Sequence, residues 1–410
     1  MKPSTLRTLS IVALACALAG PTAAQTPETR EEELRARREA KAKELEKERQ
    51  GRVERFLVSL ENDRIFERLL NPPEGVYPLI GHVTPGSGLS LGVGYRQPRL
   101  FDERAVFQAS AAGSPRKYWL IDTRLLLPRL ANEAAQVEFY AHRSWWPEEA
   151  FFGLGPDSLR REHANFSLGN TVVGGSGAVR TGRLLTLGGR AEYLRPRSGR
   201  GRAKSIPNAG TLFPGEEIPG FGASTNFGRF EAFADFNYRE PLMNPRRGGR
   251  YYVSYALFDD LHLDRYGFRR LEVDLQQYVP FLRDRRVFAF RALLSASDAV
   301  AGQQVPFYLM RSLGGPDDLR GFRRHRFRDA NLLLFQAEYR WEVFTAVDAA
   351  LFVDAGQVAP RVSDFDLEDL ETDYGFGLRF GSVNGVFLRV EGAFGSRDGK
   401  HFILRFGHVF

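Results

Sequence analysis

Hydrophobic and polar side chains alternate with a period of two along most of the chain after Val76. The clearest case is residues 401–410, where one face carries Phe402, Leu404, Phe406, His408 and Phe410. A period of two is the repeat of a β-strand whose two faces meet different surroundings, and helical periodicity is lost in this region. The pattern predicts an all-β protein from residue 76 to residue 410.

The second face of several predicted strands carries charged residues. Between Leu333 and Val343, apolar positions alternate with Gln336, Glu338, Arg340 and Glu342. A charged face repeated on neighbouring strands is wrong for a dry sandwich core and suits the wet lumen of a membrane barrel. Lipid leaves no partner for open backbone groups, so a sheet that spans a membrane must close on itself.

The predicted connections alternate between two kinds. Compact turns led by proline include residues 98–102 and 128–132, whereas residues 196–225, 297–330 and 359–372 form long stretches. Short turns on one side and long loops on the other are typical of outer-membrane barrels. Counting strands between them predicts a transmembrane antiparallel β-barrel of about 16 strands. The loop that holds Arg320 then lies outside, between strands eleven and twelve.

The first 24 residues have the features of a signal peptide. Lys2 and Arg7 form a positive start, residues 9–18 are apolar, and Thr22-Ala23-Ala24 is a small-residue cleavage site. The alternative, a lipid attached to Cys16, lacks suitable preceding residues. Residues 25–75 are rich in Glu, Arg and Lys and predict a short helical or flexible periplasmic segment. This segment is either a solvated tether or an arm that contacts a partner.

The amino-acid composition supports a β-barrel and argues against several other classes of protein. After the first two dozen residues no apolar run is long enough for a transmembrane helix, and 33 Phe and 41 Gly suit girdles and tight turns. The single cysteine, Cys16, leaves with the signal peptide, which excludes disulfides and thiol catalysis. The net charge of +7 comes from scattered arginines, so we expect no nucleic-acid partner.

The sequence contains no recognisable catalytic or metal-binding motif. Residues 174–178 lack the last glycine of a nucleophile elbow. The seven histidines are dispersed, and the acidic run at residues 364–369 lacks the ligand order of a calcium loop. We therefore expect no enzyme activity, no cofactor and no metal site.

Two motifs near the C-terminus resemble those of the BamA/TamA superfamily of outer-membrane barrels, which includes bacterial surface antigens. The first is Leu313-Gly314-Gly315 followed by Leu319-Arg320-Gly321-Phe322, and the second is Phe352-Val353-Asp354-Ala355-Gly356. Members of this family generally carry periplasmic POTRA domains before the barrel. Residues 25–75 are too few for one such domain, so the resemblance implies a POTRA-less member.

The resemblance also implies a lock between a loop and the barrel wall. In such barrels the sixth outer loop folds into the lumen, so that Arg320 meets Asp354 and Glu338. The implied lock comprises Arg320, Gly321, Phe322, Glu338, Phe352, Asp354 and Gly356. Strand parity agrees, because Phe352 and Asp354 share a face and Glu338 lies among polar positions. The alternative is that Arg320 is a solvated loop charge.

The family implies a bacterial outer-membrane protein that assists insertion of outer-membrane proteins or moves a polypeptide across the membrane. An irregular first strand containing Pro78 and Gly81 fits a weak seam that admits an incoming strand. Phe402, Phe406 and Phe410 would be the C-terminal assembly signal. Expected partners are outer-membrane lipid including lipopolysaccharide, a client polypeptide and a separate periplasmic protein. The alternative is a passive loop-plugged pore or structural surface antigen.

Overall fold

The computed structural model describes residues 74–84, 86–213, 218–282, 285–344, 347–382 and 385–405. The predicted signal peptide, residues 25–73, and Phe406 and Phe410 of the predicted assembly signal lie outside these ranges. Within them, no helix has the length and apolar character needed to cross a bilayer.

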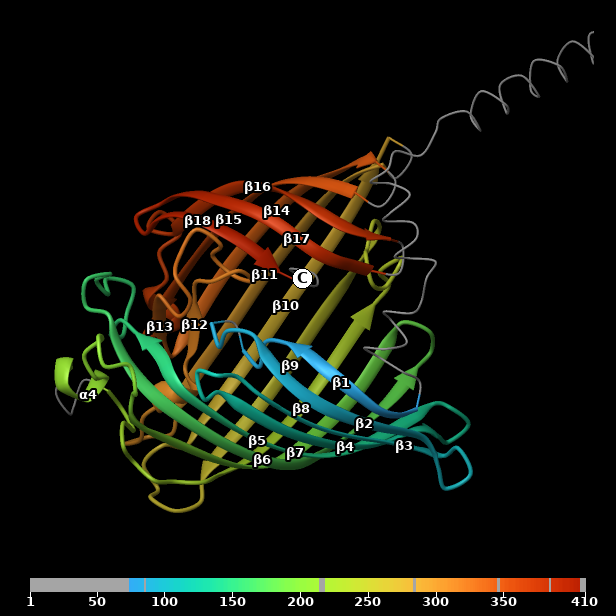
Figure 1. Ribbon diagram of the computed structural model, residues 1–410, viewed down its shortest axis with the longest axis horizontal. Helices are drawn as coiled ribbons and strands as arrows, with labels where there is room; N and C mark the ends of the chain where they lie inside the picture. The colour runs from blue at the N-terminus through green and yellow to red at the C-terminus, as the bar shows by residue number, and fades with distance from the viewer. Residues whose placement is uncertain are drawn as a thin grey trace, which may run out of the picture. The chain divides into compact units, whose positions relative to one another are not determined.

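Sixteen antiparallel strands form one sheet, and each pairs with its neighbours in chain order. The first eight are β1 (Gly75–Gly81), β2 (Ser90–Leu100), β3 (Ala105–Gly113), β4 (Trp119–Leu130), β5 (Ala135–Phe151), β6 (Ala164–Thr181), β7 (Leu185–Arg200) and β8 (Phe227–Asn237). The other eight are β9 (Gly248–Asp260), β10 (Phe268–Phe281), β11 (Arg286–Ala299), β14 (Asn331–Phe344), β15 (Val347–Ala359), β16 (Glu371–Ser382), β17 (Gly385–Ser396) and β18 (Gly399–Arg405). The predicted all-β fold and strand number are confirmed. Figure 1 shows the sheet curled, so that the blue first strands and the red last strands both face the viewer.

Connections alternate as the sequence predicts. Short turns join β2 to β3 and β4 to β5, and Phe101, Asp102 and Glu103 there adopt left-handed backbone angles. The opposite ends carry the longer loops, here numbered as outer loops. Those used below are loop 3 (residues 152–163), loop 4 (201–226), loop 6 (300–330), loop 7 (360–370) and loop 8 (397–398). Loops 4, 6 and 7 contain the short helices α4 (Ala209–Leu212), η2 (Phe307–Leu309) and η3 (Val362–Asp364).

The predicted starts of several connections were wrong, because β2, β4, β7 and β11 continue past Pro98, Pro128, Pro196 and Ser297. Pro196 lies inside β7, opposite Asn170 of β6, rather than at the start of loop 4. β8 pairs with β7 only as far as Leu194, so beyond that residue β7 has a single partner. A proline costs little there, because the missing N–H is not needed by a second neighbour.

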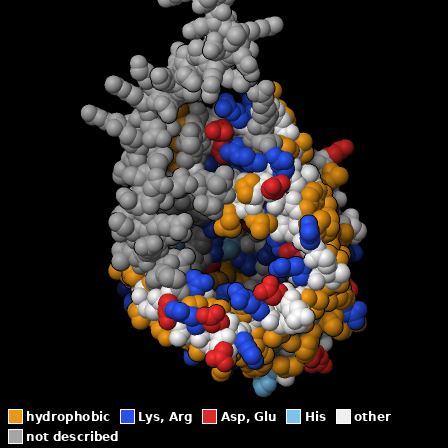
Figure 2. All heavy atoms as spheres, turned by 90° about the vertical axis from the view of Figure 1, so that its right-hand side faces the viewer, with side chains coloured by type: hydrophobic (Ala, Val, Ile, Leu, Met, Phe, Trp, Pro, Cys, Tyr) orange, Lys and Arg blue, Asp and Glu red, His pale blue; other side chains and the backbone are white. Residues whose placement is uncertain are grey.

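The two faces of the sheet separate by polarity. On β15 and β16 the outward Leu351, Val353, Tyr374 and Phe376 are 48–60% exposed, whereas inward Asp354 is fully buried. Figure 2 shows charged side chains around a hollow at one end and hydrophobic ones on the outer flank. The predicted parity, apolar outside and charged inside, is confirmed. It is the distribution that lipid outside and water inside require.

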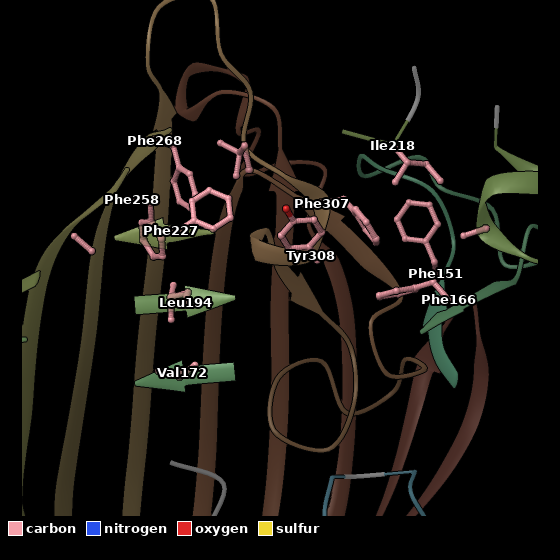
Figure 3. Packing of buried hydrophobic residues seen from close by; sticks show 14 of the residues in the cluster. Phe151, Phe166, Val172, Leu194, Ile218, Phe227, Phe258, Phe268, Phe307 and Tyr308 are labelled. Atoms are coloured by element: carbon pink, nitrogen blue, oxygen red, sulfur yellow. The ribbon is translucent and has the colours of Figure 1, made fainter. Parts of the chain in front are cut away.

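An aromatic cluster fills the inner face near loops 4 and 6 (Figure 3). Phe151 and Phe166 come from β5 and β6, and Phe307 enters from loop 6. The rings of Phe166 and Phe307 lie edge to face with centroids 4.9 Å apart. This packing brings the first part of loop 6 against the inner wall and directs the rest of the loop inward.

Candidate functional site

Loop 6 returns as a small hairpin inside the curled sheet. Its arms are β12 (Arg311–Leu313) and β13 (Phe327–Asp329), which pair with each other in a separate two-stranded sheet. Arg328 of β13 also forms an isolated antiparallel bridge with Gly155 of loop 3. Apolar loop residues pack on the inner wall in one buried cluster of Leu293, Leu313, Leu319, Phe322, Phe327, Leu332, Leu334 and Val358. Burial of this apolar surface stabilises the hairpin against the inner wall, independently of its ion pairs.

Arg320 lies at the tip of this hairpin and is fully buried. Its Nε and Nη2 donate to the two carboxylate oxygens of Asp354, both at 2.7 Å. Its Nη1 donates to Glu338 Oε1 at 2.6 Å. A planar guanidinium matches a carboxylate in this two-bond geometry, which a lysine ammonium cannot reproduce.

Phe352 forms the floor beneath Arg320. The Arg320 guanidinium carbon lies 3.5 Å from the ring centroid, a cation–π contact. Gly375, opposite Phe352 on β16, makes room for this ring, because a Cβ there would lie 2.3 Å from the ring. Phe352, the tip of loop 6 and the carboxylates of Asp354 and Glu338 therefore pack together as one unit.

The acids are shared with further arginines. Glu338 also accepts from Arg340 Nε at 2.7 Å and from Arg379 Nη2 at 2.5 Å. Glu391 Oε1 lies 3.5 Å from both Arg320 and Arg379. The network joins β14, β15, β16 and β17 through loop 6. Breaking one member leaves buried charge uncompensated, which is far costlier than losing an exposed ion pair.

Electrostatics keep Arg320 charged in this dry surrounding. Burial by itself lowers the pKa of Arg320, but the charges of Asp354 and Glu338 outweigh burial and raise the pKa above its ordinary value. The guanidinium therefore carries its charge at every accessible pH.

The match to a family model decides which proteins this barrel is related to. A model described as the Omp85 superfamily domain matches residues 167–397, more than half of the chain. This chain belongs to the Omp85 superfamily. The superfamily handles protein insertion and translocation, its members are generally not enzymes, and membership places the barrel in the bacterial outer membrane.

Solved structures support the fold of this Omp85 barrel. BamA from Haemophilus ducreyi lacking POTRA domains 1–3 is 15% identical, with a TM-score of 0.59 over 85% of this chain and 77% of that chain. CdiB from Escherichia coli is 14% identical, with a TM-score of 0.53 over 80% of this chain and 61% of that one. CdiB from Acinetobacter baumannii is 12% identical, with a TM-score of 0.50 over 82% and 58%. No curated protein matches the sequence.

The two glycines of the predicted lock are needed for space. A Cβ on Gly321 would lie 2.5 Å from the Cβ of Asp373. The backbone of Gly321 is not left-handed, so close approach to Asp373 explains why a glycine stands here. At Gly356 a Cβ would lie 2.8 Å from the Leu333 carbonyl oxygen and 3.1 Å from Leu313 of the hairpin.

The structure brings most predicted site residues of this Omp85 barrel together. All seven residues of the loop-to-wall lock lie in or directly against the buried network and its apolar support. Phe402 is separate, because it points outward from β18 and is 75% exposed. The sequence reading did not assign Arg340, Arg379 or Glu391 to the site. The alternation of side chains along their strands places all three on the inner face, and this alternation is the sequence signal that could have pointed to them.

A second set of contacts ties loop 6 to two other outer loops. Arg326 Nη1 and Nη2 donate to Ser158 Oγ at 2.8 Å and to the Ser158 carbonyl at 2.7 Å in loop 3. Arg326 Nε donates to Asp398 of loop 8 at 3.1 Å. Arg397 of loop 8 in turn donates to the Pro156 carbonyl at 3.0 Å. We call these contacts the outer clamp.

We predict that Arg326→Gln opens the outer clamp. Hydrogen bonds to a charged group are worth about 1.5–3 kcal/mol each, so the open population should rise by about tenfold or more. Chymotrypsin digestion of the folded protein should then cut loop 3 faster. Arg160→Gln, an exposed change in the same loop, is the control and should leave the rate unchanged. Equal rates in the wild type and Arg326→Gln would show that the clamp does not restrain loop 3.

Proposed function

We propose that this Omp85 barrel handles polypeptides at the outer membrane, by assisting insertion of outer-membrane proteins or by moving a polypeptide across. The observation that carries the proposal is the buried fork of Arg320 onto Asp354, with Glu338 as second acceptor. It holds loop 6 inside the lumen, next to the strands at the C-terminal edge of the sheet. A barrel that is filled in this way acts on its cargo through regulated opening rather than through free diffusion.

The edges of the sheet offer a second support. β1 and β18 are the terminal strands of the sheet, and β1 has seven residues. No hydrogen-bond ladder joins them within the part of the chain that the structure describes. Unpaired edge groups can pair with an incoming strand, which is the contact that insertion of another barrel requires.

The proposed partners follow from the same surfaces. Client strands would pair at the edges, and the outward apolar face would contact outer-membrane lipid including lipopolysaccharide. A separate periplasmic protein would deliver the client, and residues 25–75 would lie on its side of the membrane.

Planar-bilayer conductance tests the proposal. We compare the refolded wild type with a deletion of residues 314–328, which removes the tip of loop 6 and Arg320. Small, noisy wild-type currents that become a large, steady pore after deletion are expected, because the loop fills the lumen. Deleting residues 361–368 of loop 7, which are mostly exposed, is the control and should change little.

Two outcomes distinguish the alternatives. A steady open pore already present in the wild type would contradict the proposal and favour a passive channel. Loop gating without any acceleration of the folding of an unfolded outer-membrane protein in liposomes that contain the barrel would favour a loop-plugged structural surface antigen. Arg320→Ala gives the same comparison with a single substitution, should the deletion fail to fold.

A further inference from the structure

A cavity of about 390 Å³ lies between the loop 6 hairpin and the inner wall. Its lining combines residues of β5 and β6 with residues of both hairpin arms. It is distinct from the lock, since neither Arg320 nor Asp354 lines it. At this volume it is at the small end of the range of ligand pockets.

One arginine that lines the cavity, Arg328, lacks a counter-ion among the described residues. Glu149 of β5 is the carboxylate on this side, and its Oε2 lies 3.9 Å from Arg324 Nη2. Arg328 is 6% exposed and has no carboxylate within ion-pair distance among the residues that the structure describes. Arg328 Nη1 donates only to the carbonyls of Phe307 and Met310, at 3.0 and 3.4 Å. Its buried Nε has no hydrogen-bond partner.

A buried guanidinium without a counter-ion is unfavourable. Burial lowers the pKa of Arg328 to about 10, which still leaves it charged at neutral pH. Arg328 thus lines the cavity without a counter-ion among the described residues. An anion placed here would supply one.

A hydrogen-bonded Ser–His–Glu series borders the same cavity and has the residue types of a catalytic triad. Ser312 Oγ lies 2.6 Å from His325 Nδ1, and His325 Nε2 lies 3.1 Å from Glu149 Oε2. Acyl transfer would require His325 to take up a proton. Burial, together with the charges of Arg324 and Arg328, lowers the pKa of His325 to about 4, so that step is disfavoured. The chain instead fixes the neutral ring and the hairpin against β5.

The rest of the lining decides what kind of anion fits. Apolar side chains line the cavity beside the arginines, namely Phe166, Leu168, Leu293, Met310 and Leu332. Asp317 and Asp318 also line it and would repel a doubly charged group. Arg405 already pairs with Asp317, and Arg311, which also lines the cavity, lies 3.4 Å from Glu272. The cavity therefore suits a single negative charge on a hydrocarbon tail.

We propose that this cavity binds a short-chain carboxylate, with its head at Arg324 and Arg328 and its tail on the apolar wall of β6, β11 and β14. A planar carboxylate can accept two hydrogen bonds from a guanidinium fork. The site does not depend on polypeptide handling and would exist in a passive barrel equally.

Calorimetric titration of the purified full-length barrel in lipid nanodiscs tests this site, with sodium hexanoate as the probe at pH 7.5. Saturable binding at one site per barrel is expected. Inorganic phosphate and acetate supply the head alone, and hexanol supplies the tail alone; each should bind at least about tenfold more weakly. Equal binding of hexanol would mean apolar partition only, and equal binding of acetate or phosphate would mean an unspecific anion site. Either result, or no saturable binding, overturns the proposal.

Variants locate the binding. Arg328→Gln should weaken hexanoate binding by about tenfold or more, whereas Arg124→Gln, which removes a lumen arginine paired with Asp122, should not change it. Leu168→Glu serves as the second variant, because it places a carboxylate in the cavity that competes with the probe. Unchanged binding in a folded Leu168→Glu or Arg328→Gln protein would overturn the assignment.

Discussion

Replacing Arg320 with alanine is expected to destabilise the folded barrel by about 3–5 kcal/mol, the range for removing one partner of a buried ion pair. Asp354 would lose its guanidinium and keep Gln336 Nε2 at 3.1 Å and the backbone N–H of residue 320 at 3.3 Å, next to buried Asp373 on the adjacent strand. Glu338 would suffer less, since Arg340 and Arg379 still contact it. The free energy of unfolding, measured with urea in detergent micelles, reports the loss.

A double-mutant cycle decides whether the pair acts as a unit. Asp354→Ala alone should also destabilise, and the double variant should be little worse than either single one, because removing both partners leaves less uncompensated charge. Arg250→Ala is the matched control: Arg250 forms a similar fork on Asp235, but both side chains are 22–29% exposed. The control should cost about 1 kcal/mol or less. Additive losses for Arg320 and Asp354 would argue against a lock.

Gly321→Ala is expected to have an effect nearly as large. The new Cβ would lie 2.5 Å from the Asp373 Cβ, an atom that cannot rotate away, so the backbone next to Arg320 must shift. Overpacking of a rigid site costs about 1–3 kcal/mol, and the displaced guanidinium fork adds to this. Urea unfolding and the rate of protease cleavage in loop 6 should both show the change.

A second-site change tests the cause. Asp373→Gly removes the clashing Cβ, so the Gly321→Ala, Asp373→Gly variant should recover much of the loss that Gly321→Ala causes. Gly177→Ala is the control, because a Cβ there meets only Val137 at an ordinary 3.9 Å. If Gly177→Ala proved as harmful as Gly321→Ala, or if Asp373→Gly gave no recovery, steric contact with β16 would not be the reason for the glycine.

The outer clamp is a second restraint on loop 6, in addition to the lock at Arg320. Loop 6 is held at its tip by Arg320 on the C-terminal strands, and at Arg326 by loops 3 and 8. Movement of loop 6 during a functional cycle would therefore have to release both contacts. The clamp and lock predictions can be measured separately, because the two arginines share no acid among the described residues.

The sequence by itself determined the strands and their faces, and its two motifs implied the main ion pair through the family resemblance. The period of two predicts which residues point inward, because successive side chains of a strand alternate regardless of its neighbours. Loop lengths then predicted about 16 strands and placed Arg320 in an outer loop between strands eleven and twelve. The paired motifs implied that Arg320 reaches Asp354 and Glu338, and these residues are in contact in the structure.

Only the tertiary structure decided which other charges join them. Parity places Arg379 and Glu391 on the inner face, but the register between strands decides whether they lie beside Glu338 or several residues away. The contacts of Arg326 with Ser158 and of Arg397 with Pro156 join segments 168 and 241 residues apart. Such contacts, like the cavity at Arg328, depend on how the sheet curls and where loop 6 enters it. Local periodicity carries no information about either, because it describes each strand and not the space between strands.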